Sequence, residues 1–145
     1  MQDKRKEDLC KYRMENSSDS LEVAKDCLEK GYYKDAVNRS YYAVFYAIKS
    51  VLALEGKDFK RHKDVIAYFN QTYVASGIIP REIGRKIGRL QQKREKSDYD
   101  DFYLASKDET IEQIENADEA ISMIKKYLEK RLTDSDSVIS RFESL

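Results

Sequence analysis

The residues of this chain that could do chemistry begin with Arg39 and Tyr46. Their spacing is about two turns of a helix, so both side chains would point in the same direction. An arginine guanidinium can bind anionic groups, and a tyrosine hydroxyl can donate or accept a hydrogen bond. This face is therefore a candidate site. The simpler interpretation is that Arg39 pairs with an acid and the tyrosines only fill space.

A second candidate is His62, the only histidine in the sequence. Histidine changes its charge near neutral pH, which makes His62 the sole candidate for histidine acid or base chemistry. It lies beside Arg61 and Lys63 at the start of a predicted helix, where a lone histidine is more often simply exposed. One histidine and the distant Cys10 and Cys27 do not form a ligand cluster, so no metal and no other cofactor is expected.

A third group is a run of basic residues in the predicted fourth helix. Steps of four residues would align five of them into one cationic ridge, which could follow a phosphate backbone. These five are Arg81, Arg85, Arg89, Lys93 and Lys96. The other interpretation is a solvated face, or one that pairs with the acidic start of the next helix. Those acids are Asp108, Glu109, Glu112, Glu115, Asp118 and Glu119.

Arg94 differs from its basic neighbours because it falls in line with Ile87 and Leu90. This helical phase points its guanidinium inward, where it needs a partner. Asp98, one turn further along, and Asp101 are the nearest acids. We therefore expect a structural ion pair, with Arg94 and Asp98 as its members.

The elements that must position these residues are predicted to be helices. One proline and five glycines leave little turn material for a sheet, and 41% hydrophobic with 37% charged residues suits one core under a charged surface. Apolar periodicity predicts helices at about residues 8–30, 33–54, 61–74 and 80–97, and a long fifth helix that starts at the capping box of Ser106 and Glu109. The expected organisation is one all-α domain over residues 1–132, with a polar tail at 133–145 that is frayed or forms a short helix.

The predicted second helix carries apolar residues on more than one side, including Tyr42 and Tyr46 opposite its main stripe. Such a helix lies at the centre of a bundle or in a subunit interface. We predict a two-fold dimer from this face. In the fourth helix, Gly84 and Gly88 each cost about 1 kcal/mol relative to alanine, which suggests a close helix approach or a bend.

Charge and hydropathy exclude some classes of protein. Basic and acidic residues number 27 each, so the net charge does not indicate nucleic-acid binding and only local distribution can. No apolar run approaches the roughly 18 residues of a membrane span, and the N-terminus does not resemble a signal peptide. We expect a cytoplasmic protein without a membrane partner. Cys10 and Cys27 would lie roughly 25 Å apart on one helix and cannot pair with each other.

The segment 31–47, GYYKDAVNRSYYAVFYA, resembles the second-helix signature of prokaryotic HEPN proteins of the UPF0332 type. Weaker matches follow in the expected order: RHKDVI at 61–66 with Phe69, the turn at 77–80, and Arg94 followed by Asp98 and Tyr99. The resemblance covers about residues 20–130. It implies an up-and-down helical bundle that commonly dimerises, is often encoded beside a minimal nucleotidyltransferase, and in many members acts as a toxin ribonuclease.

Ribonuclease members of that family place a histidine a few residues after an arginine, and the motifs of two subunits face each other. Arg39 occupies the arginine position, and Tyr46 stands where this subfamily often has the histidine. A phenol is a poor general base at neutral pH. RNA cleavage would then require a strongly perturbed Tyr46, or His62 as its substitute.

Two functions follow from the resemblance. The first, which we favour, is a dimeric partner of a minimal nucleotidyltransferase that binds RNA or a nucleotide; the alternative is a metal-independent toxin endoribonuclease using Arg39 with Tyr46 or His62. The candidate nucleotide- or RNA-binding residues are Asn38, Arg39, Tyr42, Lys63, Arg81, Arg85, Arg89 and Lys93. A third hypothesis is that the partner enzyme modifies a tyrosine, and the sequence does not choose among Tyr41, Tyr42 and Tyr46.

Overall fold

The computed structural model describes residues 4–132, and all regular structure in that range is helical. Its elements are α1 (Lys4–Glu29), α2 (Tyr33–Glu55), α3 (His62–Phe69), the π-helical turn η1 (Asn70–Val74), α4 (Arg81–Tyr99) and α5 (Lys107–Arg131). The all-α prediction is confirmed. The predicted tail at 133–145 lies outside the described residues.

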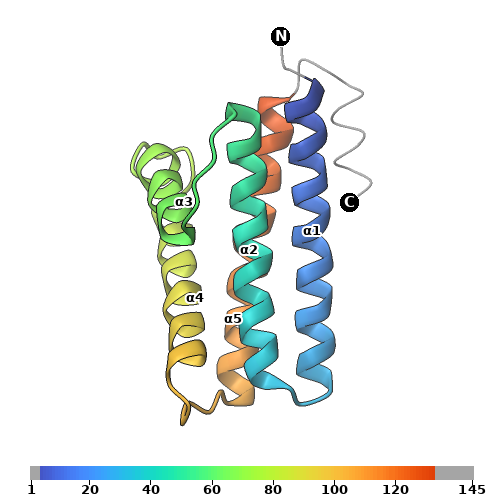
Figure 1. The fold of residues 1–145 in the computed structure, drawn as a ribbon, viewed down its shortest axis with the longest axis vertical. Coiled ribbons are helices and arrows are strands. Elements are labelled where there is room, and N and C mark those ends of the chain that lie inside the picture. Colours follow the sequence, from blue (N-terminus) through green and yellow to red (C-terminus); the bar gives the residue numbers. More distant parts are fainter. Residues whose placement is uncertain (1–3, 133–145) are drawn as a thin grey trace.

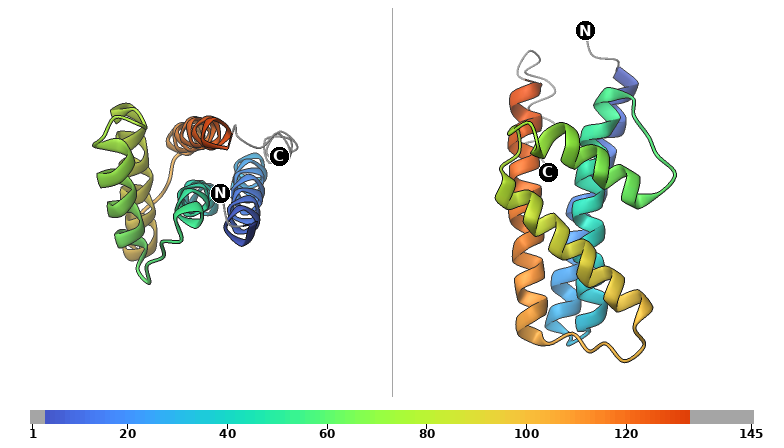
Figure 2. Two further views of the ribbon diagram at one scale, coloured as in Figure 1. Left: turned by 90° about the horizontal axis from the view of Figure 1, so that it is seen from above. Right: turned by 90° about the vertical axis from the view of Figure 1, so that its left-hand side faces the viewer.

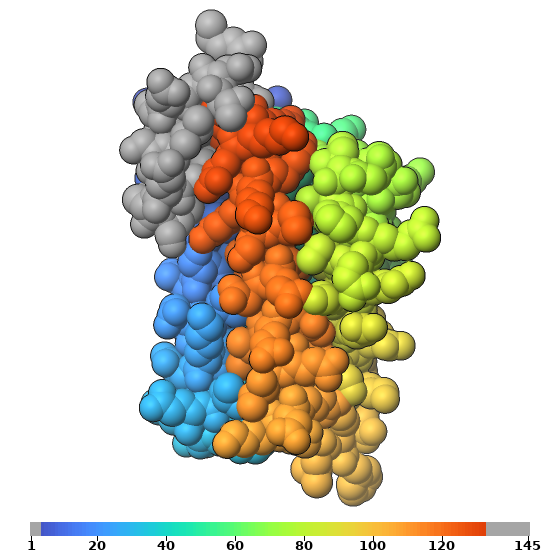
Figure 3. Space-filling model, turned by 180° about the vertical axis from the view of Figure 1, so that it is seen from behind, coloured from blue at the N-terminus to red at the C-terminus, as the bar shows by residue number. Residues whose placement is uncertain are grey.

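The four long helices run alternately down and up the molecule (Figure 1). Seen from above, α2 lies among the other helices, and it contacts α1, α3, α4 and α5 (Figure 2). From behind, α5 fills the space between α1 and the α3–α4 hairpin (Figure 3). Of the two places predicted for the second helix, the structure shows the centre of the bundle.

Small residues let α1 lie close against α2. Ala43 and Ala47 of α2 are fully buried, and the hydroxyl of Ser17 on α1 donates a hydrogen bond to the Ala43 carbonyl over 2.6 Å. Arg13 of α1 donates to the carbonyl of Lys49 over 3.0 Å. These contacts fix the register of the two helices, which sets the opposing walls of the site described below.

Helix ends follow local chemistry. The Ser106 side chain accepts a hydrogen bond from the backbone N–H of Glu109, so the predicted start of α5 is confirmed. Gly77, at a φ of 86°, lies in the left-handed region after η1, where a break was predicted. The third helix differs from its prediction because it changes to π-helical hydrogen bonding at Asn70. The Ala75 N–H there donates to the Asn70 carbonyl over 2.8 Å.

The two glycines of α4 have different environments. A Cβ atom on Gly84 would lie 2.8 Å from Cγ1 of Val74 in η1, which is closer than two carbon atoms can approach. A Cβ atom on Gly88 would meet no atom within 4 Å. The expected close approach therefore exists at Gly84 and is absent at Gly88.

The second face of α2 is largely covered within one chain. Ala43, Ser50 and Ala53 of that face are buried, while Tyr42 and Tyr46 are half-buried. α1 covers the small residues of this face, and α3 and α4 pack nearby. The two tyrosines are not fully covered, and the two-fold dimer stays a prediction.

None of the helices described between residues 4 and 132 is long and apolar enough to cross a membrane. No group of three His, Cys, Asp or Glu in that range could hold a metal ion. Cys10 is buried, Cys27 is half-buried, and both are free thiols.

Candidate functional site

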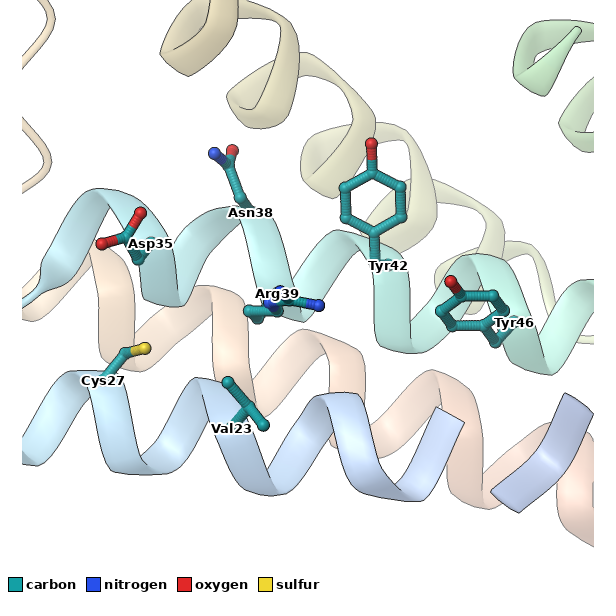
Figure 4. A pocket seen from close by; sticks show the side chains of 7 residues that line it. All are labelled: Val23, Cys27, Asp35, Asn38, Arg39, Tyr42 and Tyr46. Atoms are coloured by element: carbon teal, nitrogen blue, oxygen red, sulfur yellow. The ribbon is translucent and has the colours of Figure 1, made fainter. Parts of the chain in front are cut away.

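Arg39 and Tyr46 line one open pocket of about 560 Å³ between α1 and α2 (Figure 4). Val23 and Cys27 of α1 lie on one side, and Asn38 and Tyr42 of α2 point toward α4 on the other (Figure 4). The helical spacing of α2 thus brings together four residues predicted from sequence. They are Asn38, Arg39, Tyr42 and Tyr46.

Arg39 is exposed and makes no ion pair or hydrogen bond with any residue in the described range. Asp35, one turn earlier on α2, lines the same pocket but forms no ion pair with Arg39. The simpler interpretation, in which an acid neutralises Arg39, is therefore not what residues 4–132 show. An exposed guanidinium of this kind can bind an anionic group.

Tyr42 is held from α4. Arg94 Nη2 donates a hydrogen bond to the Tyr42 hydroxyl over 3.2 Å. Arg94 Nε also lies 2.9 Å from Asp98 Oδ2, in an ion pair whose N–H direction does not meet hydrogen-bond geometry. The guanidinium carbon lies 5.4 Å from the ring centre of Tyr41 and 5.7 Å from that of Tyr42. Arg94, paired with Asp98, therefore holds the Tyr42 ring in position from α4.

The three tyrosines of this segment differ in exposure. Tyr41 is buried, and burial raises the pKa of its hydroxyl to about 12. Tyr42 and Tyr46 are half-buried and line the pocket with Arg39. Only these two of the three side chains are placed to meet a ligand or a modifying enzyme there.

His62 lies beside Tyr42 and Phe45. Its ring packs on Phe45 with 4.1 Å between ring centres and faces Tyr42 edge-on at 5.9 Å. Burial, and then the charges of Arg94 and Lys49, hold the pKa of His62 below its ordinary value. His62 is not among the residues that line the Arg39 pocket. The structure thus packs the imidazole into an aromatic cluster and separates it from Arg39.

The cationic ridge is partly neutralised. Of its members, Lys93 forms an ion pair with Glu109, and Arg85 lies 3.4 Å from Glu82 on its own helix. Lys86, which is not part of the ridge, pairs with Glu119. Arg81 and Arg89 are exposed and have no acidic partner among residues 4–132. Lys63 is exposed at the start of α3. None of these cations lines the Arg39 pocket.

Residues of α1 were not predicted from the sequence as part of the site. An adjoining pocket of about 330 Å³ shares Val23, Arg39 and Tyr46 with the first. Its remaining lining residues are Tyr12, Asn16, Asp19 and Ser20. A signal was present, because positions 12, 16, 19, 23 and 27 repeat every three to four residues outside the apolar stripe of α1. The two pockets together form one groove, here called the Arg39 groove.

Comparisons with known proteins agree with this architecture. The family model described as "HEPN domain" matches residues 10–127. A "UPF0332 protein" of Thermotoga maritima is 30% identical over 86% of this chain and 94% of its own length. Two proteins of Methanocaldococcus jannaschii, each bearing the name "Putative toxin", are also similar. One is 36% identical over 59% of this chain and 64% of its own length, and the other 27% over 79% and 78%.

Proposed function

This chain belongs to the HEPN domain family, and we propose that it binds RNA or a nucleotide at the Arg39 groove as the toxin-like member of a toxin–antitoxin-like pair. The observation that carries the proposal is Arg39, exposed and without an acidic partner in residues 4–132, among Asn38, Tyr42 and Tyr46. Arginine binds phosphate through two parallel N–H donors, and the aromatic rings and the amide beside it offer stacking and hydrogen bonds to a nucleoside.

Binding is better supported than cleavage. General base catalysis needs an acceptor within hydrogen-bond reach of the 2′-hydroxyl. Tyr46 is a phenol, and the His62 ring packs on Phe45 outside the lining of the groove. Arg39 needs neither residue in order to hold a phosphate. The exposed Arg81 and Arg89 of α4 would extend the contact to a longer strand.

The names of two relatives and the family resemblance support the proposed partnership. Two relatives carry the word toxin in their names. That the partner is a minimal nucleotidyltransferase is what the resemblance of residues 31–47 implies. We place this chain in such a pair as a homodimer, the assembly that the family resemblance implies. Co-expression with a nucleotidyltransferase encoded next to its gene should yield one complex on size exclusion and relieve growth arrest. A monomer in sedimentation, or arrest that the partner leaves unchanged, would contradict this arrangement.

The test of binding is fluorescence anisotropy with a labelled single-stranded RNA octamer. Arg39→Ala should weaken binding roughly 10- to 150-fold, since a hydrogen bond to a charged group contributes about 1.5–3 kcal/mol. Lys25→Ala is the matched control, because it removes the same charge from an exposed position that lines neither pocket of the groove. Equal affinities of Arg39→Ala, Lys25→Ala and wild type would sink the proposal.

A further inference from the structure

The function proposed above does not say what the α1 side of the Arg39 groove contributes. It presents Tyr12, Asn16 and Asp19, one after another along the helix, beside Arg39 and Tyr46 of α2. Tyr12 is 60% exposed, although it lines a pocket. None of Tyr12, Asn16 and Asp19 has a side-chain hydrogen bond or ion pair within residues 4–132. Their polar and aromatic groups are therefore free to meet a ligand.

The charges of the groove limit what that ligand can be. Among the described residues that line it, Arg39 is the only cation, and Asp19 and Asp35 are the acids. A long phosphate backbone needs several cations in a row, and the groove does not supply them. A ligand with one phosphate, bound by Arg39, and an adjoining uncharged planar group would match these charges.

The residue types favour a nucleobase as that flat group. Tyr12 and Tyr46 place two aromatic rings in one pocket, and every base offers a face that stacks on such rings. Asn16 and Asp19 supply an amide and a carboxylate, which bind the donors and acceptors of a base edge. A lipid tail or an aliphatic ligand would leave these polar groups unsatisfied.

From these observations we infer that Tyr12 is the base-stacking residue of a nucleotide subsite, in which Arg39 holds the phosphate and the base lies against Tyr12 and Tyr46. The inference rests on the proposed function and extends it to α1. The shared chemistry is a nucleoside phosphate, which either single-stranded RNA or a free mononucleotide can supply.

The sequence contains no tryptophan, so one introduced tryptophan reports on its own position. Tyr12→Trp places it in the subsite. Tyr32→Trp is the matched control, because Tyr32 is 59% exposed, lies in the turn before α2 and lines neither pocket of the groove. Titration with an RNA octamer should quench the emission of Tyr12→Trp at the midpoint seen by anisotropy and leave Tyr32→Trp unchanged. A parallel titration with AMP separates the two sources: quenching by AMP assigns the subsite to mononucleotides as well, and quenching by RNA alone assigns it to the strand.

Alanine variants give the energetic test. Tyr12→Ala should weaken RNA binding roughly 5- to 150-fold, the range for loss of one stacked base, and Tyr12→Phe should stay within about threefold of wild type. The slope of log affinity against log salt should not change, because stacking releases no counterions. Tyr32→Ala should bind like wild type. Equal thermal melts will show that each variant is folded.

The outcomes separate this inference from the function on which it rests. Loss of binding in Arg39→Ala but wild-type affinity in Tyr12→Ala would overturn the subsite and leave the proposed function standing. No loss in either variant would overturn both. If Tyr12→Trp emits as a buried residue without RNA, and its emission shifts with protein concentration, a second copy of the chain covers Tyr12 and the subsite is excluded.

Discussion

The guanidinium of Arg94 on α4 donates a hydrogen bond to the hydroxyl of Tyr42 on α2, over 3.2 Å. Arg94 also pairs with Asp98, one turn further along its own helix. A side chain from the fourth helix thereby orients a ring that lines the Arg39 groove. This contact therefore serves two purposes: it orients Tyr42 in the groove, and it contributes to the free energy of folding.

Arg94→Ala should destabilise the protein by about 2 kcal/mol in urea denaturation, because it strands a partly buried carboxylate and the Tyr42 hydroxyl. The Arg94 and Asp98 side chains are only 21% and 32% exposed. Arg85→Ala is the control on the same helix, since its pair with Glu82 is 61% and 55% exposed and should contribute less than about 0.5 kcal/mol. Similar losses in the two variants would show that Arg94 contributes only as a surface charge.

The two glycines of α4 should respond to alanine in opposite directions. Gly88→Ala meets open space and should stabilise the protein by about 0.5–1 kcal/mol, because alanine is the better helix former. Gly84→Ala drives a Cβ atom against Val74, whose branched side chain has little freedom, and should instead destabilise by about 1 kcal/mol. Adding Val74→Ala should remove this clash. Thermal melts of the variants check the signs, and stabilisation by Gly84→Ala would refute the close approach.

His62 should titrate below its ordinary pKa of 6.5, because burial and the charges of Arg94 and Lys49 disfavour the imidazolium. It is the only histidine, so its ring protons give one NMR titration curve without assignment. Arg94→Gln should raise the midpoint. A midpoint at or above the ordinary value would contradict the packing against Phe45 and the neighbouring charges.

The same pKa shift of His62 predicts a pH dependence of stability. The unfolded chain binds the proton first as the pH falls, so the contribution of His62 is fully present above pH 6.5 and is lost as the pH falls through the lower folded pKa. His62→Gln should not show this loss of stability between about pH 8 and 5.5. This range lies above the ordinary carboxyl pKa values, so carboxyl groups contribute little to the comparison. The check is the urea midpoint of the wild type and of His62→Gln, measured against pH. If the two curves stay parallel over this range, His62 does not contribute to the pH dependence of stability.

Purified wild-type protein should show no ribonuclease activity above an Arg39→Ala control, because no histidine lines the groove with Arg39. Tyr46→His places a base in the groove, and a positioned base typically contributes about 10²- to 10⁴-fold. Gel assays of a labelled RNA should therefore detect cleavage in Tyr46→His that a second change, Arg39→Ala, abolishes. Wild-type cleavage lost in Tyr46→Phe would make Tyr46 catalytic, and cleavage lost only in His62→Ala would move the proton chemistry to α3.

If the ridge contacts RNA, its unpaired arginines should carry the salt dependence. Arg81→Ala with Arg89→Ala should lower the slope of log affinity against log salt by up to about 1.4, since each phosphate contact to a single strand contributes about 0.7. Lys86→Ala should change it less, because Lys86 already pairs with Glu119. An unchanged slope in the double variant would leave the ridge as a solvated surface.

Local spacing alone determined the helices and several of their ends. The apolar period of α2, the capping of α5 by Ser106 and the inward phase of Arg94 all depend on residues three or four positions apart, which a sequence displays directly. The same spacing placed Arg39, Tyr42 and Tyr46 on one side of a helix. The change to a π-helical turn at Asn70 escaped prediction because it alters the hydrogen-bond partner without breaking the apolar pattern.

Only the tertiary structure decided which residues meet across helices. It placed Tyr12 and Asn16 of α1 in the groove with Arg39, and it packed His62 against Phe45 outside the lining of that groove. It also paired Lys93 with an acid of α5 and left Arg89 exposed, although both belong to one ridge. The physical reason is that register and crossing angle between helices depend on packing among distant segments, such as Ala43 against α1 and Gly84 against Val74.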